Sequence, residues 1–536
     1  MTGAMTYNLA DLWEAVADHV PERTALVCGD RRLAYGELDE RATRLAHWLA
    51  GKGVERGQFV GLQLLNGPEY VEAMLAAYKI RAVPVNVNYR YVADELRYLY
   101  DDAGLVGVVH HRAFAPRIAD VRDGRWCLAV DDGSGEDLRS VEAERYEEAL
   151  AASSAERDFG PRSGDDLYVI YTGGTTGMPK GVVWRSEDAF FACMSGGDIT
   201  RSAGVITAPE QLVERVGGPI VYLPVAPLMH AAGTWTVMMW LFAGGRIVLL
   251  PGSLDPVELW RTVEREEVNA ITVVGDPVLR PLLDAWDGLA GSVDASSLFT
   301  IGSGGAPMST GVRSRAMAAF PQALVVDGYG SSEAGVQGAT RFDEHTRGRM
   351  GSTFVPADAM VVDPDTLAPV APGSGEVGRV ARSGRVPLGY HNDPVKTAAT
   401  FPTVDGRRWA VSGDLATVGD DGAITVLGRG SLCINTGGEK VYPDEVEGVL
   451  RASPQVYDVV VVGAPDERWG QRVVAVVQPQ EGGGREPSAA ELQDWARASL
   501  AGYKVPKDVV FVDQVVRSPS GKADYRWAAG VAAGAT

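Results

Sequence analysis

Short apolar runs alternate with longer amphipathic segments through the first three fifths of this chain. Runs rich in Val, Ile and Leu predict buried strands, and the apolar spacing between them is typical of helices. The predicted strands are residues 25–28, 32–34, 59–64, 82–86, 107–110, 167–171, 247–250, 270–274, 298–301 and 323–326. Because strands alternate with helices, the pattern predicts an α/β fold.

The pattern changes towards the C-terminus. Residues 351–427 form short strands between Gly and Pro turns, which predicts a small β-rich subdomain. Beyond residue 429 we predict helices at 443–451 and 489–500 and strands at 456–462, 473–477 and 509–512. The predicted fold is therefore α/β, with a large N-terminal domain (1–429) of two α/β subdomains plus the β-rich subdomain, and a small α+β C-terminal domain (430–536). We expect the tail after Trp527 to be frayed.

One loop carries the first chemical prediction. Residues 171–181 read Tyr-Thr-Gly-Gly-Thr-Thr-Gly-Met-Pro-Lys-Gly, directly after a predicted strand. Such a loop exposes backbone N–H groups to a polyphosphate, while hydroxyls and a lysine add donors and charge. A polar surface turn is the alternative, and it accounts less well for so long a run. The predicted phosphate-binding residues are Thr172, Gly173, Gly174, Thr175, Thr176, Gly177 and Lys180.

The loop is not a P-loop of the kinase or GTPase type. That motif needs Ser or Thr after its lysine, whereas Gly181 follows Lys180 and Ala523 follows Lys522. The net charge of −20 also argues against nucleic acid or an anionic membrane surface as an obligatory partner. The four scattered cysteines form no metal or disulfide spacing, and no apolar run is long enough for an integral membrane segment. We therefore expect a cytoplasmic protein.

Further motifs follow the loop along the chain. They are Pro227-Leu-Met-His-Ala-Ala-Gly233, Gly302-Ser-Gly-Gly-Ala-Pro307, Asp327-Gly-Tyr-Gly-Ser-Ser-Glu333, Ser412-Gly-Asp414 with Gly428-Arg429, Gly437-Gly-Glu-Lys-Val-Tyr-Pro443 and Pro519-Ser-Gly-Lys522. Together with the loop they resemble the motifs of adenylate-forming enzymes, the superfamily of acyl-CoA synthetases, luciferases and peptide-synthetase adenylation domains. The resemblance extends over nearly the whole chain and implies ATP, Mg²⁺ and coenzyme A as cofactor or co-substrates.

The resemblance implies roles at the reacting phosphate. Glu333 follows a Gly-Ser-Ser turn, where a carboxylate can hold Mg²⁺ with most of its waters; a helix-start glutamate is the alternative. Ser332 stands where the family usually has Thr and would donate its hydroxyl to the α-phosphate. Lys522 would neutralise charge between the attacking carboxylate and that phosphate, rather than being a solvated tail lysine. The implied catalytic residues are thus Lys522, Glu333, Lys180 and Ser332.

The resemblance also implies the nucleoside contacts. Tyr329 would stack on adenine, Asp414 would accept both ribose hydroxyls, and Arg429 would contact the ribose or a phosphate. The remaining residues of the adenine segments are Gly304, Gly305, Ala306, Pro307, Asp327, Gly328 and Gly330.

In similar enzymes the C-terminal domain rotates after adenylation. This withdraws the lysine and brings in a loop, here Gly437 and Gly438, to shape a pantetheine tunnel. The family's hinge position normally holds Asp or Lys, and this chain has Ser431 beside the more flexible Gly430. The resemblance therefore implies a mobile C-terminal domain.

The motif that ends at Gly233 resembles the family's acyl pocket. We assign Met229, His230, Gly233, Thr234 and Gly302 to this pocket; a satisfied core histidine is the alternative for His230. Amino-acid-activating members carry a carboxylate here and this chain has none, so an amino acid is disfavoured. Small residues on both walls leave room for a long or bulky apolar acyl group.

Longer segments refine the resemblance: residues 181–185, 429–435, 501–506 and 518–527 look like the corresponding segments of actinobacterial ligases for steroid side-chain acids and medium or long fatty acids.

The predicted function is an ATP-dependent acid–thiol ligase that forms acyl-AMP, releases pyrophosphate and transfers the acyl group to CoA. The partners are then the acid, ATP and CoA, and a homodimer is a further hypothesis. One alternative is an acyl-AMP ligase loading a carrier-protein thiol, although the chain lacks that group's long insertion. Another is a non-catalytic nucleotide-binding regulator, which the intact Lys180, Glu333, Asp414 and Lys522 disfavour.

Overall fold

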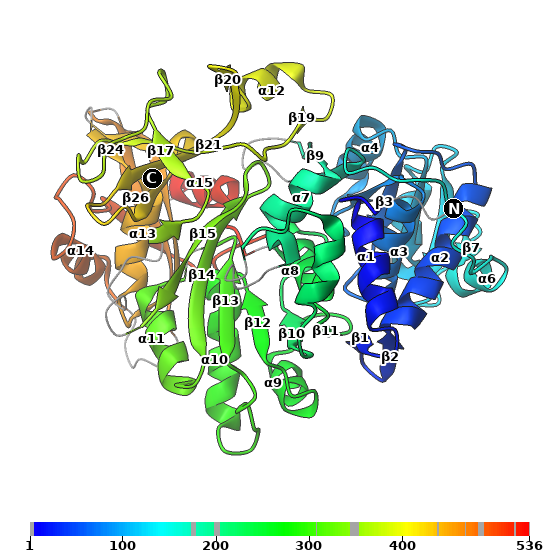
Figure 1. The fold of residues 1–536 in the computed structure, drawn as a ribbon. Coiled ribbons are helices and arrows are strands. Elements are labelled where there is room, and N and C mark those ends of the chain that lie inside the picture. Colours follow the sequence, from blue (N-terminus) through cyan, green and yellow to red (C-terminus); the bar gives the residue numbers. More distant parts are fainter. Residues whose placement is uncertain are drawn as a thin grey trace.

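The structure is a computed structural model, and it describes residues 5–172, 178–197, 204–306, 308–343, 353–436, 439–466, 468–480, 487–518 and 521–534. Sheets flanked by helices form a large N-terminal domain, and a small C-terminal domain packs beside it (Figure 1). This arrangement confirms the predicted α/β fold class. The helices are α1 (Leu9–His19), α2 (Tyr35–Gly51), α3 (Pro68–Lys79), α4 (Ala93–Asp102), α5 (Ala115–Ala119), α6 (Tyr146–Ala151), α7 (Ser186–Cys193), α8 (Ala231–Phe242), α9 (Pro256–Arg265), α10 (Gly275–Leu289), α11 (Thr310–Ala319), α12 (Pro394–Thr400), α13 (Pro443–Arg451), α14 (Ala489–Arg497) and α15 (Tyr525–Gly534).

The first subdomain is built on a parallel sheet. Its strands, in spatial order, are β4 (Val83–Asn86), β3 (Phe59–Gln63), β5 (Gly107–His111), β6 (Trp126–Val130) and β7 (Glu144–Arg145). Strand β3 is buried along its whole length, as expected where helices cover both faces of a parallel sheet.

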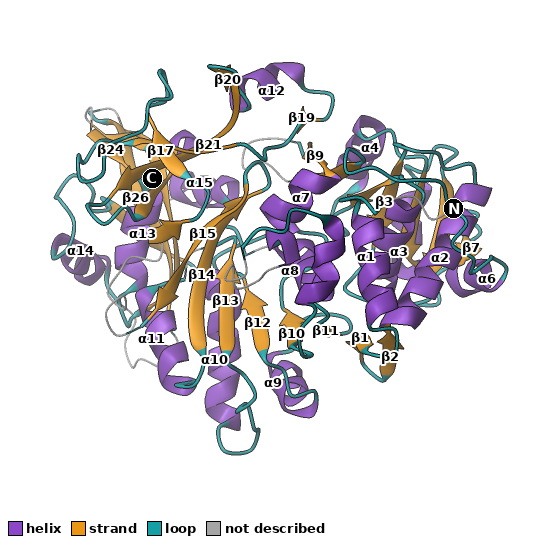
Figure 2. Ribbon diagram, viewed as in Figure 1, coloured by secondary structure: helices purple, strands orange, loops and turns teal. Residues whose placement is uncertain are grey.

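The largest sheet runs through the middle of the molecule (Figure 2). Its strands, in spatial order, are β17 (Met360–Val362), β18 (Gly378–Ser383), β21 (Arg407–Val418), β22 (Ile424–Arg429), β16 (Thr353–Pro356), β15 (Gly335–Phe342), β14 (Leu324–Ser331), β13 (Thr300–Gly304), β12 (Ala270–Val273), β10 (Val221–Pro224), β11 (Arg246–Leu249), β1 (Thr24–Cys28) and β2 (Arg31–Ala34), with β20 (Thr403–Val404) paired to β21. The β-rich subdomain is therefore a continuation of the second α/β sheet rather than a separate one.

Four neighbouring strands of this sheet place the predicted motifs. Strands β10, β12, β13 and β14 are parallel, so their carboxyl ends lie at the same edge. In open α/β sheets that edge is where ligands bind. The segments that lead away from it include the predicted acyl and adenine motifs. Apolar residues of α9, α10 and α11 pack on one face of these strands and fix their positions.

A three-stranded antiparallel sheet carries the glycine-rich loop. Strands β8 (Leu167–Thr172) and β9 (Lys180–Arg185) form a hairpin in which Thr172 pairs with Lys180. Strand β19 (Gly389–Tyr390) pairs with the other side of β9. The segment that follows β19 is thereby brought beside the lysine of the loop.

The C-terminal domain has one mixed sheet between helices. Its strands are β24 (Glu439–Val441), β23 (Ile434–Thr436), β26 (Gly470–Pro479), β25 (Val456–Asp466) and β27 (Asp508–Phe511). Helices α13 and α14 pack on one face, and α15 packs on the other through Ala528 and Ala532. The prediction of a frayed tail is wrong, because the described part of that tail is helical and covers a sheet face.

Candidate active site

The predicted ribose residues lie on two paired strands. Asp414 on β21 and Arg429 on β22 are directly opposite each other, and the Arg429 Nε lies 3.3 Å from the Asp414 carboxylate. The Tyr329 hydroxyl donates a 2.6 Å hydrogen bond to the same carboxylate. The Tyr329 ring stacks on Phe354 with 4.4 Å between centroids. The structure therefore joins the predicted adenine and ribose residues in one hydrogen-bonded group.

The rest of the adenine segment forms strand backbone. Gly304 and Gly328 pair across β13 and β14, and Gly305 follows with a φ of +89°, which favours glycine. At Gly330 a side chain would lie 2.6 Å from the carbonyl oxygen of Gly335, so close packing requires glycine there. Ala306 continues this edge, whereas Pro307 lies outside the described residues.

Asp327 belongs to β14, the strand that also contains Gly328 and Gly330. Its carboxylate accepts a 3.4 Å hydrogen bond from the Met308 amide, and its side chain is buried. Burial raises the pKa of Asp327 to about 7, against the favourable effects of that amide and of Arg313. Its direct contacts are thus with the strand–helix junction, and nucleotide binding by Asp327 stays a prediction.

A buried ion pair holds the turn that carries Lys522. Arg517 donates to both oxygens of Asp458, at 2.5 and 2.7 Å, and to the carbonyl of Gly521 at 3.0 Å. Gly521 has a φ of +71°, and a side chain there would lie 3.0 Å from the carbonyl oxygen of Val274 in the N-terminal domain. Contacts of Arg517 within the C-terminal domain therefore hold this turn, and Gly521 packs against the N-terminal domain.

The charge of Lys522, on the C-terminal domain, interacts with those of the predicted ribose residues Asp414 and Arg429. Lys522 remains in contact with solvent, yet surrounding protein and Arg429 lower its pKa, while Glu333 and Asp414 oppose that shift. The structure thus brings Lys522, Glu333, Asp414 and Arg429 into one electrostatic group, although they are far apart in sequence. The ring of Tyr457, 5.1 Å from the Arg280 guanidinium, adds a contact across the same interface.

Glu333 is oriented by a residue that the motifs did not include. The Tyr390 hydroxyl donates to Glu333 Oε1 at 3.0 Å, and the indole of Trp184 donates to the carbonyl of Ser332 at 3.1 Å. In the described residues there is no cluster of three His, Cys, Asp or Glu side chains that could hold a metal. One carboxylate held in place, as Glu333 is, is enough to bind Mg²⁺, because this ion keeps several waters and takes its other ligands from substrate phosphates.

Lys180 is held by a second unpredicted residue. Its ammonium lies 2.6 Å from Asp393 Oδ2, and Asp393 follows β19 directly before α12. Thr172 is the residue paired with Lys180 at the base of the hairpin. The other predicted loop residues lie outside the described residues, as do the two glycines of the predicted pantetheine loop: Gly173, Gly174, Thr175, Thr176, Gly177, Gly437 and Gly438.

Two asparagines of the first subdomain hold the predicted acyl segment. Asn86, at the end of β4, donates to the carbonyls of Met229 and Tyr171 at 2.7 and 2.8 Å and accepts from the Tyr171 amide. Asn66 accepts from the amide of Leu228. Because Tyr171 leads into the glycine-rich loop, Asn86 connects the predicted phosphate and acyl segments.

The acyl residues occupy the start of α8 and the strand opposite. At Gly233 a side chain would lie 2.5 Å from the carbonyl oxygen of Pro227, so this turn requires glycine. Thr234 is buried and its hydroxyl contacts the carbonyls of His230 and Ala231. Gly302 pairs with Thr272 on β12. These contacts show how the segment is built, and the acyl-binding role stays a prediction.

His230 is the half-buried histidine of this segment, and no described residue hydrogen-bonds its buried Nε2 atom. Burial lowers its pKa to about 4, and Lys522 and Arg90 act in the same direction. The folded protein therefore binds this proton less readily than the unfolded chain, so stability is lost as pH falls from about 6.5 towards 4. The ring is neutral at physiological pH, which suits an apolar pocket.

We expect the substitution His230→Gln to reduce this pH dependence. Between pH 7 and pH 5 the wild type should lose about 2 kcal/mol more unfolding free energy than the variant. Urea unfolding at both pH values measures the difference, and the equally shifted His110 is present in both proteins. An identical loss in the two proteins would show that His230 is not buried in its neutral form.

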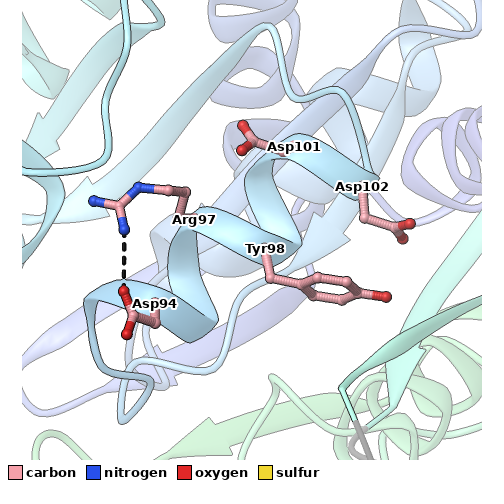
Figure 3. Close-up of a pocket in the computed structure, with 5 residues that line it drawn as sticks. All are labelled: Asp94, Arg97, Tyr98, Asp101 and Asp102. Carbon is pink, nitrogen blue, oxygen red and sulfur yellow. Dashed lines mark hydrogen bonds and ion pairs between the residues drawn. The ribbon is translucent and has the colours of Figure 1, made fainter.

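An acidic hollow lies outside this site. Its volume is about 430 Å³, and it is lined by residues of α4, which Figure 3 labels: Asp94, Arg97, Tyr98, Asp101 and Asp102. Tyr98 interacts electrostatically with Lys180 and Asp393, so the hollow is near the lysine that we predict to bind phosphate. Three aspartates disfavour a phosphate there, and the hollow does not replace the predicted nucleotide site.

Comparison with known families gives two matches. The model of the AMP-binding enzyme family matches residues 13–391, and that of the AMP-binding enzyme C-terminal domain matches residues 445–522.

In the part of the chain that the structure describes, no helix combines the length and apolar character needed to cross a membrane.

Individual proteins are similar over nearly the whole chain. A 3-oxocholest-4-en-26-oate–CoA ligase of Rhodococcus rhodochrous is 43% identical and covers 98% of this chain and 96% of its own. A medium/long-chain-fatty-acid–CoA/3-oxocholest-4-en-26-oate–CoA ligase of Mycobacterium tuberculosis is 44% identical, with coverages of 98% and 96%. Among solved structures, ATP-bound MatB of Rhodopseudomonas palustris is 26% identical with a TM-score of 0.82, covering 98% of this chain and 99% of that one. A fatty acyl CoA synthetase of Mycobacterium tuberculosis is 26% identical with a TM-score of 0.70, covering 98% of each chain.

Proposed function

The chain belongs to the AMP-binding enzyme family and is an ATP-dependent acyl-CoA synthetase, and from that premise we propose how its residues act on a hydrophobic carboxylic acid. The observation that carries the proposal is the grouping of Lys522, Glu333, Asp414 and Arg429 between the two domains. The residues come from three separate motifs, and each has the charge that its predicted role needs.

The first half-reaction places one anion against another. The carboxylate oxygen of the acid attacks the α-phosphorus of ATP, and the bond to pyrophosphate breaks. The Lys522 ammonium neutralises charge that develops on the oxygens between acid and α-phosphate, and Lys180 does so on the departing phosphates. Mg²⁺ held by Glu333 would reduce the charge of the phosphate oxygens. Asp414 and Tyr329 orient the nucleoside, with the Ser332 hydroxyl as a donor to the α-phosphate.

The second half-reaction requires a different arrangement. The thiol of CoA attacks the acyl carbonyl and AMP leaves, so Lys522 is no longer needed at the phosphate. We propose that residues 430–536 rotate as a unit and that Gly437 and Gly438 then line the path of the pantetheine arm. The short 3-10 turn Gly430–Leu432 at the junction supports this, because hinges are a few loop or element-terminal residues and this turn follows β22 directly.

Both alternatives from the sequence lose support. Relatives that cover the chain almost end to end are CoA ligases, which favours CoA over a carrier-protein thiol as acceptor. The ordered contacts around Lys522, Glu333 and Asp414 disfavour a regulator that has lost catalysis.

We also propose that the protein is located in the cytoplasm. Light scattering of the purified protein would test whether it forms a homodimer.

The proposed acids are medium- or long-chain fatty acids and steroid side-chain acids. The acyl segment has no carboxylate in Met229–Gly233, and the two relatives act on such acids. Mass spectrometry of products from ATP, Mg²⁺ and an acid panel, with and without CoA, tests this directly. We expect acyl-CoA from fatty or steroid acids only when CoA is present. Acyl-AMP that accumulates and ignores CoA would instead favour the carrier-protein alternative.

A further inference from the structure

The segment from β19 to α12 adds charged groups to the phosphate side of the site. It lies at the edge of the molecule in Figure 1 and pairs with β9 through Gly389 and Tyr390. Neither the glycine-rich loop nor the other predicted motifs include this segment. Its contacts nevertheless reach two of the predicted catalytic residues, Lys180 and Glu333.

One aromatic ring brings two lysines together. The ammonium of Lys180 lies 5.9 Å from the centroid of the Tyr390 ring, and that of Lys396 lies 5.0 Å from it. The hydroxyl of the same ring is hydrogen-bonded to Glu333. Two cations and the candidate magnesium carboxylate are therefore arranged around Tyr390, where cation–π attraction holds the ammonium groups.

Asp393 is the carboxylate that balances these charges. Its Oδ2 accepts from Lys180 at 2.6 Å and its Oδ1 accepts from the backbone N–H of Lys396 at 2.9 Å, which caps α12. Both oxygens are engaged by donors, so the carboxylate is placed to neutralise Lys180 rather than to ligate a metal. Lys180 hydrogen bonding lowers the pKa of Asp393, so the carboxylate is ionised.

In the part of the chain that the structure describes, no carboxylate forms an ion pair with Lys396 as Asp393 does with Lys180. Partial desolvation and the nearby charge of Lys180 lower the pKa of Lys396, and the carboxylates of Glu333 and Asp393 oppose that shift. The two ammonium groups near the Tyr390 ring therefore repel each other. An anion placed between them would relieve that repulsion. The departing pyrophosphate has that charge, and the roles proposed for Lys180 and Glu333 would place it on this side of the site.

We propose that Lys396 is a second pyrophosphate-binding cation, and that Asp393 neutralises Lys180 until the phosphates of the nucleotide displace it. This inference rests on the proposed function, because it extends the leaving-group side of the same site. Lys180 and Lys396, which both lie beside the Tyr390 ring, then contact the β- and γ-phosphates. In the free enzyme Asp393 balances the charge of Lys180, and after nucleotide binding the phosphates balance it instead.

The first test compares Lys396→Gln with Arg407→Gln. Arg407 is exposed on β21, next to the same projecting segment, and its guanidinium covers Trp409 rather than Tyr390. Calorimetry with Mg²⁺-pyrophosphate should show binding about tenfold weaker in Lys396→Gln and unchanged in Arg407→Gln. AMP binding should be unchanged in both, and Lys396→Arg should recover most of the pyrophosphate affinity. These last two results separate a phosphate contact from a general loss of structure.

The outcomes distinguish the role of Lys396 from the ligase function on which it rests. If wild type and Lys396→Gln bind ATP and pyrophosphate equally tightly, the role of Lys396 is wrong and the ligase function stands. If the wild type binds neither ATP nor pyrophosphate, the proposed function is wrong as well.

The second test uses Asp393→Asn. Asparagine is as good a helix cap as aspartate, so α12 should be preserved while the competing charge is lost. We expect pyrophosphate to bind about threefold to tenfold more tightly, because Lys180 is no longer neutralised. Unchanged binding would show that Asp393 does not compete with phosphate. Weaker binding would make Asp393 a ligand of the metal–phosphate complex and would equally overturn its assigned role.

Discussion

Lys522→Ala should slow acyl-adenylate formation by about 10²–10³-fold, the loss typical of removing one positioned charge-stabilising group. The ammonium reaches Glu333, Asp414 and Arg429 from the other domain, and no other lysine or arginine of its turn is free to replace it: Arg517 is held by Asp458. Adenylation can be measured as pyrophosphate release in the first turnover. The melting temperature should change little, since Lys522 remains in contact with solvent.

The same variant should still perform the second half-reaction. Starting from synthetic acyl-AMP and CoA, the rate of thioester formation should stay near that of the wild type, because Lys522 is not needed for thiol attack. Arg526→Ala is the matched control, since this exposed cation lies four residues further along the chain, on α15. Wild-type adenylation in Lys522→Ala, or equal loss in both half-reactions, would contradict the assigned role.

The sequence predicted the elements best where burial alone determines them. The helix at 443–451 coincides with α13, and the strand at 167–171 is β8 with one more residue. Both have apolar residues at the spacing that their own packing requires. The tail failed this test because its apolar residues are alanines and the single Val531. In α15, Ala528 and Ala532 suffice to cover a sheet face that the rest of the domain provides.

The glycine-rich motifs were harder to place than the apolar runs. Gly302–Gly304 and Asp327–Ser331 have the composition of turns, yet they continue β13 and β14. The neighbouring strands supply the reason, since Gly302 pairs with Thr272 on one side and Val326 on the other. Backbone hydrogen bonding across a sheet needs no side chain, so local propensity did not decide these positions.

The missed site residues all act over long sequence separations. Asn86 contacts a strand 85 residues away, and Asp393 contacts Lys180 across 213 positions. Neither stands in a pattern that indicates catalysis, and the sequence alone does not distinguish Tyr390 from an ordinary buried tyrosine of the core. Their contribution depends on how β19 aligns with β9, which only the folded chain shows.

Glu333→Gln is expected to have the other large effect. Glutamine has nearly the same shape and can still accept the Tyr390 hydrogen bond, so the substitution removes charge without removing the contact. If the carboxylate holds Mg²⁺ on the phosphates, adenylation should fall about 10²-fold and need a higher Mg²⁺ concentration for half-maximal rate. A magnesium titration of ATP–pyrophosphate exchange measures both quantities, with the exposed Glu376→Gln as control.

The two effects of Glu333→Gln identify the role together. A slower rate with an unchanged magnesium requirement would place Glu333 among the residues that only orient Tyr390 or Lys522. An unchanged rate would contradict a catalytic role altogether. The expected combination of slower exchange and a higher magnesium requirement follows only if the charge itself acts through the metal. Because Tyr390 holds Glu333 beside the two lysines, losing the charge of Glu333 also removes one of the two carboxylates that act on Lys396.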